Sequence, residues 1–386
     1  MDDLTLLAKQ IKHWGQKMGF SQVAISDLDV SDQKAYFDKY IQAGMHGTMQ
    51  WLETHADLRF NVDKLVPGAV RAIVVRLDYL PDSPEFSKQL SDPNHGYVSR
   101  YAWGRDYHKL MRKMLKNFAI KIEQESSKFN YRPFVDSGPV LEKTLATKAG
   151  LGWKGKNGLT INTKAGSWYF LGELLVDIPL PIDKPIEEHC GQCVSCIKMC
   201  PTQALIKPYI LDPRRCIAYL TIEHEGVIPT EFRQAIGNRI YGCDDCQIVC
   251  PWNKDTENSA HNDFQARPDV VKQSLLHLWQ WDEKTFLEKT QGSPIRRIGY
   301  VRWKRNLSIA LGNAPFSHEN LDALKSGLNQ NPIVDIHIKW AIDEQLNKQK
   351  MESLPNRQHL RLIRIIDKTN LDEHIAYVRR KTKPQD

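Results

Sequence analysis

Eight cysteines are the residues of this 386-residue chain whose spacing most clearly suggests chemistry, and all of them lie between positions 190 and 250. The first four occur in Cys190-Gly-Gln-Cys193-Val-Ser-Cys196-Ile-Lys-Met-Cys200-Pro201. Cys216 stands alone, and the rest occur in Cys243-Asp-Asp-Cys246-Gln-Ile-Val-Cys250-Pro251. Thiolates are soft metal ligands, so cysteines this dense indicate a metal-binding module.

The first run has the C-x2-C-x2-C-x3-C-P spacing of bacterial two-cluster ferredoxins, in which the fourth cysteine binds the other cluster. The second run lacks a cysteine shortly before Cys243, and Cys216 is the only candidate to replace it. The swapped arrangement predicts two 4Fe–4S clusters, which move single electrons. The first would be held by Cys190, Cys193, Cys196 and Cys250. The second would be held by Cys200, Cys216, Cys243 and Cys246.

Two other interpretations of the cysteines are weaker. Structural zinc sites use cysteine pairs separated by a longer loop rather than three cysteines in one tight run. Disulfide frameworks suit short secreted chains, whereas this chain is long. With cysteines as cluster ligands, we expect a cytoplasmic protein. The N-terminus lacks a secretory pattern, and the absence of an apolar run of about 18 residues predicts no membrane span.

The net charge of +7 is unevenly distributed. Residues 291–386 contain 17 Lys and Arg against 10 Asp and Glu, whereas residues 1–290 contain 36 of each kind. Such asymmetry predicts an anionic partner for the C-terminal part. Five cations lie around one expected helix start, with Tyr300 and Trp303 among them, a mixture that suits RNA. They are Arg296, Arg297, Arg302, Lys304 and Arg305. The alternative is a solvated basic helix.

The elements that must position these residues fall into four segments. Residues 1–185 are predicted to form an α/β domain with strands at 21–26, 72–77 and 131–135, helices at 106–126 and 140–149, and a strand pair at 159–161 and 167–175. Residues 186–255 are the cluster module and 256–290 a connecting segment. Residues 291–386 are expected to form helices at 295–313, 321–328, 333–349, 360–366 and 373–380, resembling a short HEAT-like stack.

Three stretches of the first domain carry candidate functional residues. Asp136 ends a predicted strand, where a buried carboxyl of raised pKa would act as a general acid; the alternative is a helix N-cap or turn aspartate for the following helix. The loop 150–158 has four glycines, which let backbone approach a large ligand or simply make a turn. The run 100–108 combines aromatic, cationic and acidic side chains and suits either a pocket or a helix cap.

Together these stretches resemble the epoxyqueuosine reductase family, iron–sulfur and cobalamin enzymes of queuosine synthesis in tRNA. The matching motifs occur in order along essentially the whole chain. They are His46-Gly-Thr-Met-Gln-Trp-Leu52, Tyr101-Ala-Trp-Gly-Arg-Asp-Tyr-His108, Val135-Asp-Ser-Gly-Pro-Val-Leu-Glu-Lys143, Gly152-Trp-Lys-Gly-Lys-Asn157 and the two cysteine runs.

The resemblance implies a multidomain α+β and α/β protein. Its parts would be a nitroreductase-like cobalamin domain related to reductive dehalogenases, a ferredoxin-like module and a HEAT-like tRNA-binding tail. The implied reaction is the two-electron deoxygenation of epoxyqueuosine to queuosine at the tRNA wobble position. Asp136 would be the proton donor. The residues implied to surround cobalamin are Arg59, Ser99, Asp136, Lys154, Asn157 and Thr160.

Some relatives have a cysteine where this chain has Ser99, so no side-chain cobalt ligand is expected. We also expect a monomer supplied with electrons by an external protein or small-molecule donor, with the cluster containing Cys190 nearer the cobalt. Two rival functions are a dehalogenase-like enzyme acting on a small organohalide and a pure electron-transfer protein. A small organohalide substrate would not require the basic C-terminal tail, which argues against the first rival. A pure electron-transfer protein would not require the first 185 residues, which argues against the second.

Overall fold

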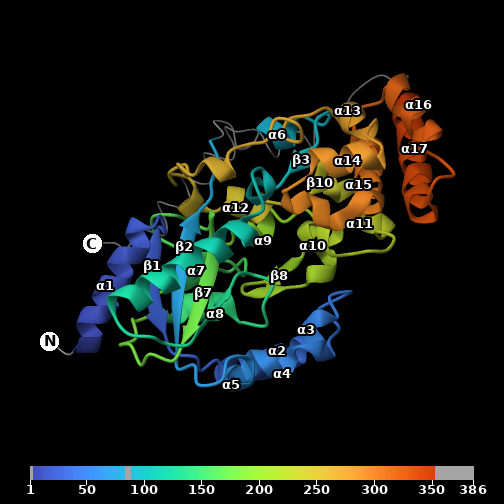
Figure 1. The fold of residues 1–386 in the computed structure, drawn as a ribbon. Helices are drawn as coiled ribbons and strands as arrows, with labels where there is room; N and C mark the ends of the chain where they lie inside the picture. Colours follow the sequence, from blue (N-terminus) through green and yellow to red (C-terminus); the bar gives the residue numbers. More distant parts are fainter. Residues whose placement is uncertain (1–2, 83–87, 353–386) are drawn as a thin grey trace. The chain divides into compact units, whose positions relative to one another are not determined.

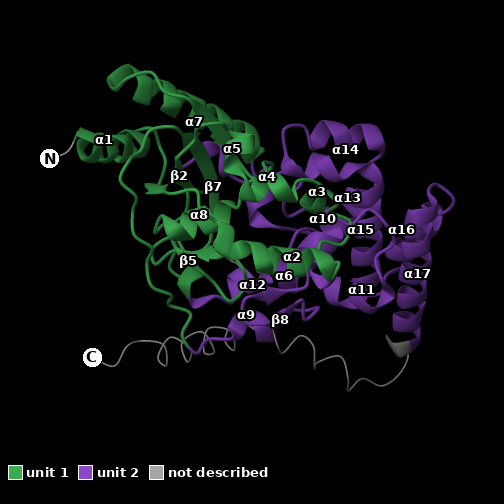
Figure 2. Cartoon of the chain, turned by 90° about the horizontal axis from the view of Figure 1, so that it is seen from below, with its two compact units in different colours: residues 1–80, 106–191, 252–259 green, residues 81–105, 192–251, 260–386 purple. Residues whose placement is uncertain are grey.

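The computed structural model describes residues 3–82 and 88–352, so the helices expected at 360–366 and 373–380 lie outside the described residues. The chain divides into two compact units that alternate along the sequence (Figure 2). Unit 1 comprises residues 1–80, 106–191 and 252–259, and unit 2 comprises 81–105, 192–251 and 260–386. This division differs from the four consecutive segments expected from the sequence, because residues 81–105 group with the later part of the chain.

Unit 1 contains a four-stranded sheet whose order is β1 (Gln22–Ser26), β2 (Arg71–Asp78), β7 (Tyr169–Val176) and β4 (Tyr131–Phe134). Every neighbouring pair is antiparallel, which makes the unit α+β rather than a parallel α/β fold (Figure 1). The expected pairing of 159–161 with 167–175 is wrong. Instead β6 (Thr160–Ile161) pairs with β5 (Trp153–Lys154), because β7 is occupied on both edges by β2 and β4.

Helices cover both faces of this sheet. On one face lie α1 (Asp3–Lys17) and α7 (Tyr107–Glu125), and Gly172 of β7 leaves room there for Met111 and Leu115. On the other face α8 (Glu142–Lys148) packs Leu145 and Ala146 into an apolar cluster with sheet residues. Shorter helices follow β1: α2 (Lys34–Gln42), α3 (Trp51–Thr54), α4 (Ala56–Phe60) and α5 (Val62–Leu65).

Unit 2 contains two small sheets and many short helices. β3 (Tyr97–Val98) pairs in parallel with β10 (Arg239–Tyr241), and β8 (Leu205–Lys207) pairs with β9 (Ile210–Leu211). The short helices are α6 (Lys88–Ser91), α9 (Ser195–Lys198), α10 (Ile217–Ile222), α11 (Thr230–Ile236) and α12 (Asp245–Ile248). Single 3-10 turns lie at Ser31–Gln33 in unit 1 and at Arg100–Ala102, Pro213–Arg215 and Asn262–Phe264 in unit 2, with another at Pro251–Asn253.

The C-terminal part of unit 2 is helical, as expected. It contains α13 (Leu275–Trp279), α14 (Glu283–Lys289), a 3-10 helix (Pro294–Ile298), α15 (Gly299–Asn313), α16 (His318–Ser326) and α17 (Pro332–Glu352). The centre is α15, whose Trp303 and Leu307 are fully buried and whose Trp303 ring stacks on Trp281 at 5.8 Å. Burial on most sides of α15 makes it a core element rather than a surface helix. No described helix is long and apolar enough to span a membrane.

Candidate active site and cluster ligands

Asp136 lies in the loop between β4 and α8 with a backbone φ of 55°, in the left-handed region that non-glycine residues rarely occupy. Such backbone strain is concentrated at functional sites. The Asp136 side chain is 55% exposed, so the expected burial of this carboxyl is wrong. The N-cap alternative is wrong too, because Leu141 occupies that position of α8 and Asp136 instead donates its own N–H to the Glu142 carboxylate.

The first turn of α7 supplies the partners of the Asp136 carboxylate. The Tyr107 hydroxyl donates to Asp136 Oδ2 at 2.8 Å, and His108 Nε2 lies 3.0 Å from the same oxygen. His108 Nδ1 lies 2.7 Å from Oδ1 of Asp106, the N-cap of α7, which also accepts the His108 backbone N–H. The Tyr107 ring stacks on Phe170 of β7 at 3.8 Å, which holds this turn against the sheet.

The His108 ring is protonated near neutral pH. Burial opposes its protonation, but hydrogen bonds with Asp106 and Asp136 and the charges of both carboxylates outweigh burial and raise its pKa to about 9. The ring therefore donates from both nitrogens, one to each carboxylate. The Asp136 carboxylate thus lies between a phenol and an imidazolium on an exposed loop, where a proton from the imidazolium could reach a bound molecule through the carboxyl group.

Sequence reasoning singled out the run 100–108 but gave Tyr107 and His108 no role. The available signal was an aspartate two residues before a histidine at a helix start, since an N-cap aspartate can hold the ring as well as the backbone. The pairing of this turn with Asp136 joins positions 28 residues apart and depends on the sheet between them.

The expected cobalamin residues of unit 1 have separate environments. Arg59 is 4% exposed, lies over the Trp51 ring and donates to the Leu52 carbonyl. Lys154 is exposed above the Tyr36 ring. Both cations therefore lie over the face of an aromatic ring.

Asn157 and Thr160 are buried within the glycine-rich hairpin. Asn157 Oδ1 accepts the Leu159 N–H at 3.1 Å. The Thr160 hydroxyl is buried without a hydrogen-bond partner in the described part of the chain, which leaves one polar group available to a ligand. Packing requires glycine at positions 152 and 155, because a Cβ atom at either position would lie 2.4 Å from an atom of Ile161.

Ser99 belongs to unit 2, unlike the other expected cobalamin residues. It is 3% exposed, and its hydroxyl donates to Asp244 Oδ1 at 2.5 Å. Asp244 also accepts from the Tyr97 hydroxyl and from the Arg100 backbone N–H. Ser99 therefore anchors the residue next to Cys243.

None of the eight cysteines forms a disulfide, which leaves their sulfur atoms available as cluster ligands. Seven lie in unit 2 and Cys190 lies near the end of a unit 1 segment. The Ala204 N–H donates to Cys200 Sγ at 3.2 Å and the Trp153 indole to Cys190 Sγ at 3.5 Å. Such donors stabilise sulfur charge and suit iron–sulfur ligation. In the described residues no three His, Cys, Asp or Glu side chains are arranged to hold a single metal ion.

Lys304 and Arg305 are not the exposed cations expected from the sequence. Arg305 is 0% exposed and donates to the carbonyls of Leu220, His224 and Gly226. Lys304 donates to the Trp279 carbonyl at 2.6 Å and lies over the Trp279 ring at 3.5 Å. The expected phosphate-binding role of these two side chains is therefore wrong, because both cap carbonyl groups inside the helical core.

The other three cations of the set keep some exposure. Arg302 is partly buried and donates to backbone carbonyls of residues 222, 297 and 298. Arg297 forms a two-pronged ion pair with Glu223, at 2.9 and 3.0 Å.

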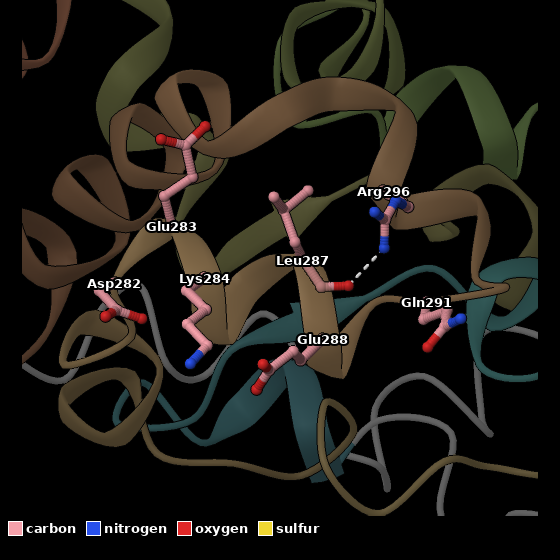
Figure 3. A pocket seen from close by; sticks show the side chains of 7 residues that line it. All are labelled: Asp282, Glu283, Lys284, Leu287, Glu288, Gln291 and Arg296. Atoms are coloured by element: carbon pink, nitrogen blue, oxygen red, sulfur yellow. Dashed lines mark hydrogen bonds between the residues drawn. The ribbon is translucent and has the colours of Figure 1, made fainter.

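Arg296 lies at a shallow pocket of about 750 Å³ (Figure 3). Three carboxylates, of Asp282, Glu283 and Glu288, line the same pocket, and Arg296 donates to the Leu287 carbonyl. Lys284 lines the same pocket, so two cations lie among these three carboxylates, and the RNA contact expected of Arg296 stays a prediction.

Comparison with known proteins agrees with these features. Residues 59–137 match the family model "Epoxyqueuosine reductase QueG, DUF1730", and residues 189–253 match the "4Fe-4S double cluster binding domain". The chain is 52% identical over 366 residues to epoxyqueuosine reductase of Vibrio cholerae, covering 95% of this chain and 98% of the relative. It is 50% identical over 370 residues to that of Escherichia coli, covering 95% and 97%.

Solved structures give the same result. A crystal structure of epoxyqueuosine reductase with an epoxyqueuosine-modified tRNA-Tyr stem loop superposes with a TM-score of 0.81 at 26% identity, covering 98% of this chain and 100% of that one. The enzyme from Streptococcus thermophilus superposes with a TM-score of 0.79 at 26% identity, covering 97% and 98%. Identity of about half over nearly the full length of both chains shows common ancestry, and this chain belongs to the epoxyqueuosine reductase family.

Proposed function

We propose that this protein reduces epoxyqueuosine to queuosine in tRNA, the last step of queuosine formation, with Asp136 as proton donor. The supporting site observation is the Asp136 carboxylate, which receives hydrogen bonds from Tyr107 and His108 at one exposed loop. Identity of 50–52% to epoxyqueuosine reductases over 95% of this chain supports the assignment of the substrate. The tRNA stem loop bound in a related structure supports the partner.

The reaction needs two electrons and two protons. Both C–O bonds of the epoxide break, a C=C bond forms, and the oxygen leaves as water. An alkoxide is a poor leaving group, so protonation of the oxygen during C–O cleavage lowers the barrier. As the strongly basic alkoxide develops, a proton moves from the charged His108 ring through the Asp136 carboxyl to that oxygen, and His108, whose pKa is raised to about 9, regains its proton from water. Tyr107 orients the carboxylate through its hydrogen bond.

Two 4Fe–4S clusters, when bound, would supply the electrons. The ligands assigned to the first cluster are Cys190, Cys193, Cys196 and Cys250. Those assigned to the second are Cys200, Cys216, Cys243 and Cys246. Burial raises the pKa of Cys243, and the neighbouring Asp245, which accepts from its thiol, raises it further, so iron must displace a proton there. An external protein or small-molecule reductant is the source of electrons.

A cobalamin fits the chemistry of unit 1, and when bound it supplies a cobalt centre that can hold two electrons. Arg59 and Lys154 on their aromatic faces, Asn157 in its hairpin and the unpartnered Thr160 hydroxyl are the side chains that would contact it. The family resemblance also assigns Ser99 to cobalamin, but Ser99 belongs to unit 2 and its hydroxyl donates to Asp244. We assign no side-chain ligand to cobalt.

The remaining assignments concern partners and architecture. Unit 1 is nitroreductase-like, the cysteine-bearing part of unit 2 is ferredoxin-like, and α15, α16 and α17 belong to a HEAT-like tRNA-binding stack. Arg296, Arg297 and Arg302 are the tail cations that retain exposure for RNA contacts. The protein acts as a cytoplasmic monomer.

The test is nucleoside analysis after anaerobic incubation of the cofactor-loaded enzyme with reductant and an epoxyqueuosine-containing anticodon stem loop. The expected result is conversion of epoxyqueuosine to queuosine. The matched control is the same enzyme without cobalamin, which should leave the substrate unchanged. Absence of queuosine with both clusters and cobalamin bound would overturn the proposal and favour a pure electron-transfer role.

A further inference from the structure

Glu173 of β7 is an acidic residue inside an apolar core. It is 0% exposed, and its partners across the sheet are Val74 of β2 and Phe134 of β4. Both Glu173 side-chain oxygens lack a hydrogen-bond donor in the part of the chain that the structure describes. An ionised carboxylate without donors is strongly disfavoured in such a place. A proton on this group is the simplest way to relieve that cost.

Glu142, the first residue of α8, is the group that faces Glu173. The two carboxyl groups interact, and Glu142 also accepts the backbone N–H of Asp136. If both were ionised, two negative charges would meet with no donor between them. One shared proton removes the repulsion and gives Glu173 a partner, as in the carboxyl pairs of aspartic proteases.

The surroundings favour a shared proton. Burial and then the Asp136 charge raise the pKa of Glu142 to about 8, and burial and the Glu142 charge raise that of Glu173. The charged groups acting on the pair are Asp136 from the loop and Lys143 from α8. Lys143 directs its ammonium to the Gly158 carbonyl, so it does not supply the missing donor.

We infer that Glu142 and Glu173 form a proton-bridged carboxyl pair that positions Asp136 for proton transfer. Glu142 accepts the backbone N–H of Asp136, a residue with a strained φ of 55°. In this backbone conformation the Asp136 carboxylate reaches Tyr107 and His108. Glu173 in turn holds Glu142. The inference rests on the proposed function only in naming the reaction that the positioned carboxylate serves. Glu142 and Glu173 are positioning residues and touch no substrate.

Matched variants separate the bridge from simple packing. Glu173→Gln keeps a donor for Glu142, whereas Glu173→Leu removes it at similar volume. Glu142→Ala removes the acceptor for the Asp136 N–H, and Glu142→Gln retains one should the alanine variant not fold. Leu175→Ala is the control, because Leu175 is buried in the apolar cluster beside α8 without contacting the Asp136 loop through a hydrogen bond.

Turnover of the loaded enzyme gives the first readout. Near neutral pH we expect Glu173→Gln and Glu142→Gln to keep kcat within about threefold of the wild type, and Glu173→Leu and Glu142→Ala to lower kcat about tenfold with KM little changed. The alkaline decline of kcat should move to higher pH in Glu173→Gln, since an amide cannot lose the bridging proton. Equal kcat for Glu173→Leu and Glu173→Gln, or an equal loss in Leu175→Ala, would overturn the bridge.

Thermal unfolding of the loaded enzyme tests the pair without turnover. A carboxyl whose folded pKa is raised adds stability that is present at low pH and is lost as pH rises through about 8. The wild-type midpoint should therefore fall more than that of Glu173→Gln as pH rises from about 5 to about 8, the range between the ordinary and the raised pKa of Glu142. Identical pH dependence would overturn the pair. Failure to form queuosine alongside the expected difference would instead overturn the proposed function.

Discussion

Arg305 offers a sharp test of how the basic C-terminal part is built. Its guanidinium is fully buried and donates to three backbone carbonyls, of Leu220, His224 and Gly226, at 2.6 to 2.9 Å. It also donates to Asn306 Oδ1, which orients the amide that itself donates to Thr221 and Ile240 carbonyls. This side chain therefore joins α15 to the segment around α10.

Replacement by methionine keeps most of the volume and removes every donor. Each buried carbonyl left unpaired costs about 1–3 kcal/mol, so three carbonyls give about 3–5 kcal/mol once partial relaxation is allowed. Arg305→Lys keeps the charge and one donor direction, and we expect about half of that loss. Arg297→Met is the surface control, because the Arg297 side chain is about half exposed and its ion pair with Glu223 contributes at most about 1 kcal/mol.

Urea unfolding followed by circular dichroism measures these differences, and filter binding of a tRNA stem loop at several salt concentrations measures RNA contacts. For Arg305→Met we expect a lower unfolding midpoint and, under conditions where the protein stays folded, an unchanged salt slope of RNA affinity. Unchanged stability together with a shallower salt slope would show that Arg305 binds phosphate and would refute the structural role.

Three further perturbations follow from the same structure. The pKa of His108 is raised to about 9, so its ion pairs stabilise the fold fully below its ordinary pKa of 6.5 and progressively less as pH rises through about 9. His108→Gln should therefore flatten the dependence of stability on pH in that range. An unchanged dependence would show that His108 is not the titrating group. Cys216→Ala should remove one cluster and leave the other, seen as a loss of about half of the bound iron by analysis and one of two spectroscopic signals; loss of neither would remove Cys216 from the ligand set. Ser99→Ala removes a donor to the buried Asp244 and should cost about 1–2 kcal/mol by urea unfolding, whereas a loss of cobalamin affinity without a stability change would make Ser99 a cofactor contact.

Local patterns predicted much of the secondary structure. The strands at 22–26 and 71–78 and the helices at 107–125 and 299–313 follow from alternation and helical spacing, which depend on neighbouring residues alone. The partner of β7 could not be predicted this way, because the chain returns to β2 and β4 from distant positions. Interleaving of the two units was hidden for the same reason, since residues 81–105 carry no composition change that marks a boundary.

The candidate site likewise contains features that local sequence patterns indicate and features that only the tertiary structure reveals. Cysteine spacing is the basis of the proposed cluster ligands, and the family resemblance is the basis of the proposed role of Asp136. The burial of Lys304 and Arg305 was missed because a cluster of cations is typical of a surface, whereas buried carbonyls at helix ends need donors that only the tertiary structure reveals. The Glu142 and Glu173 pair was missed because each acid alone looks like an ordinary polar position.

The most direct test of the central claim is single-turnover deoxygenation by Asp136→Asn, measured as queuosine formed from an epoxyqueuosine stem loop. The variant should bind both clusters, cobalamin and RNA as the wild type does, because asparagine keeps the shape and can accept from Tyr107. We predict a rate lower by about 10²- to 10⁴-fold, the usual contribution of a general acid. A wild-type rate in the fully loaded variant would contradict proton donation by Asp136.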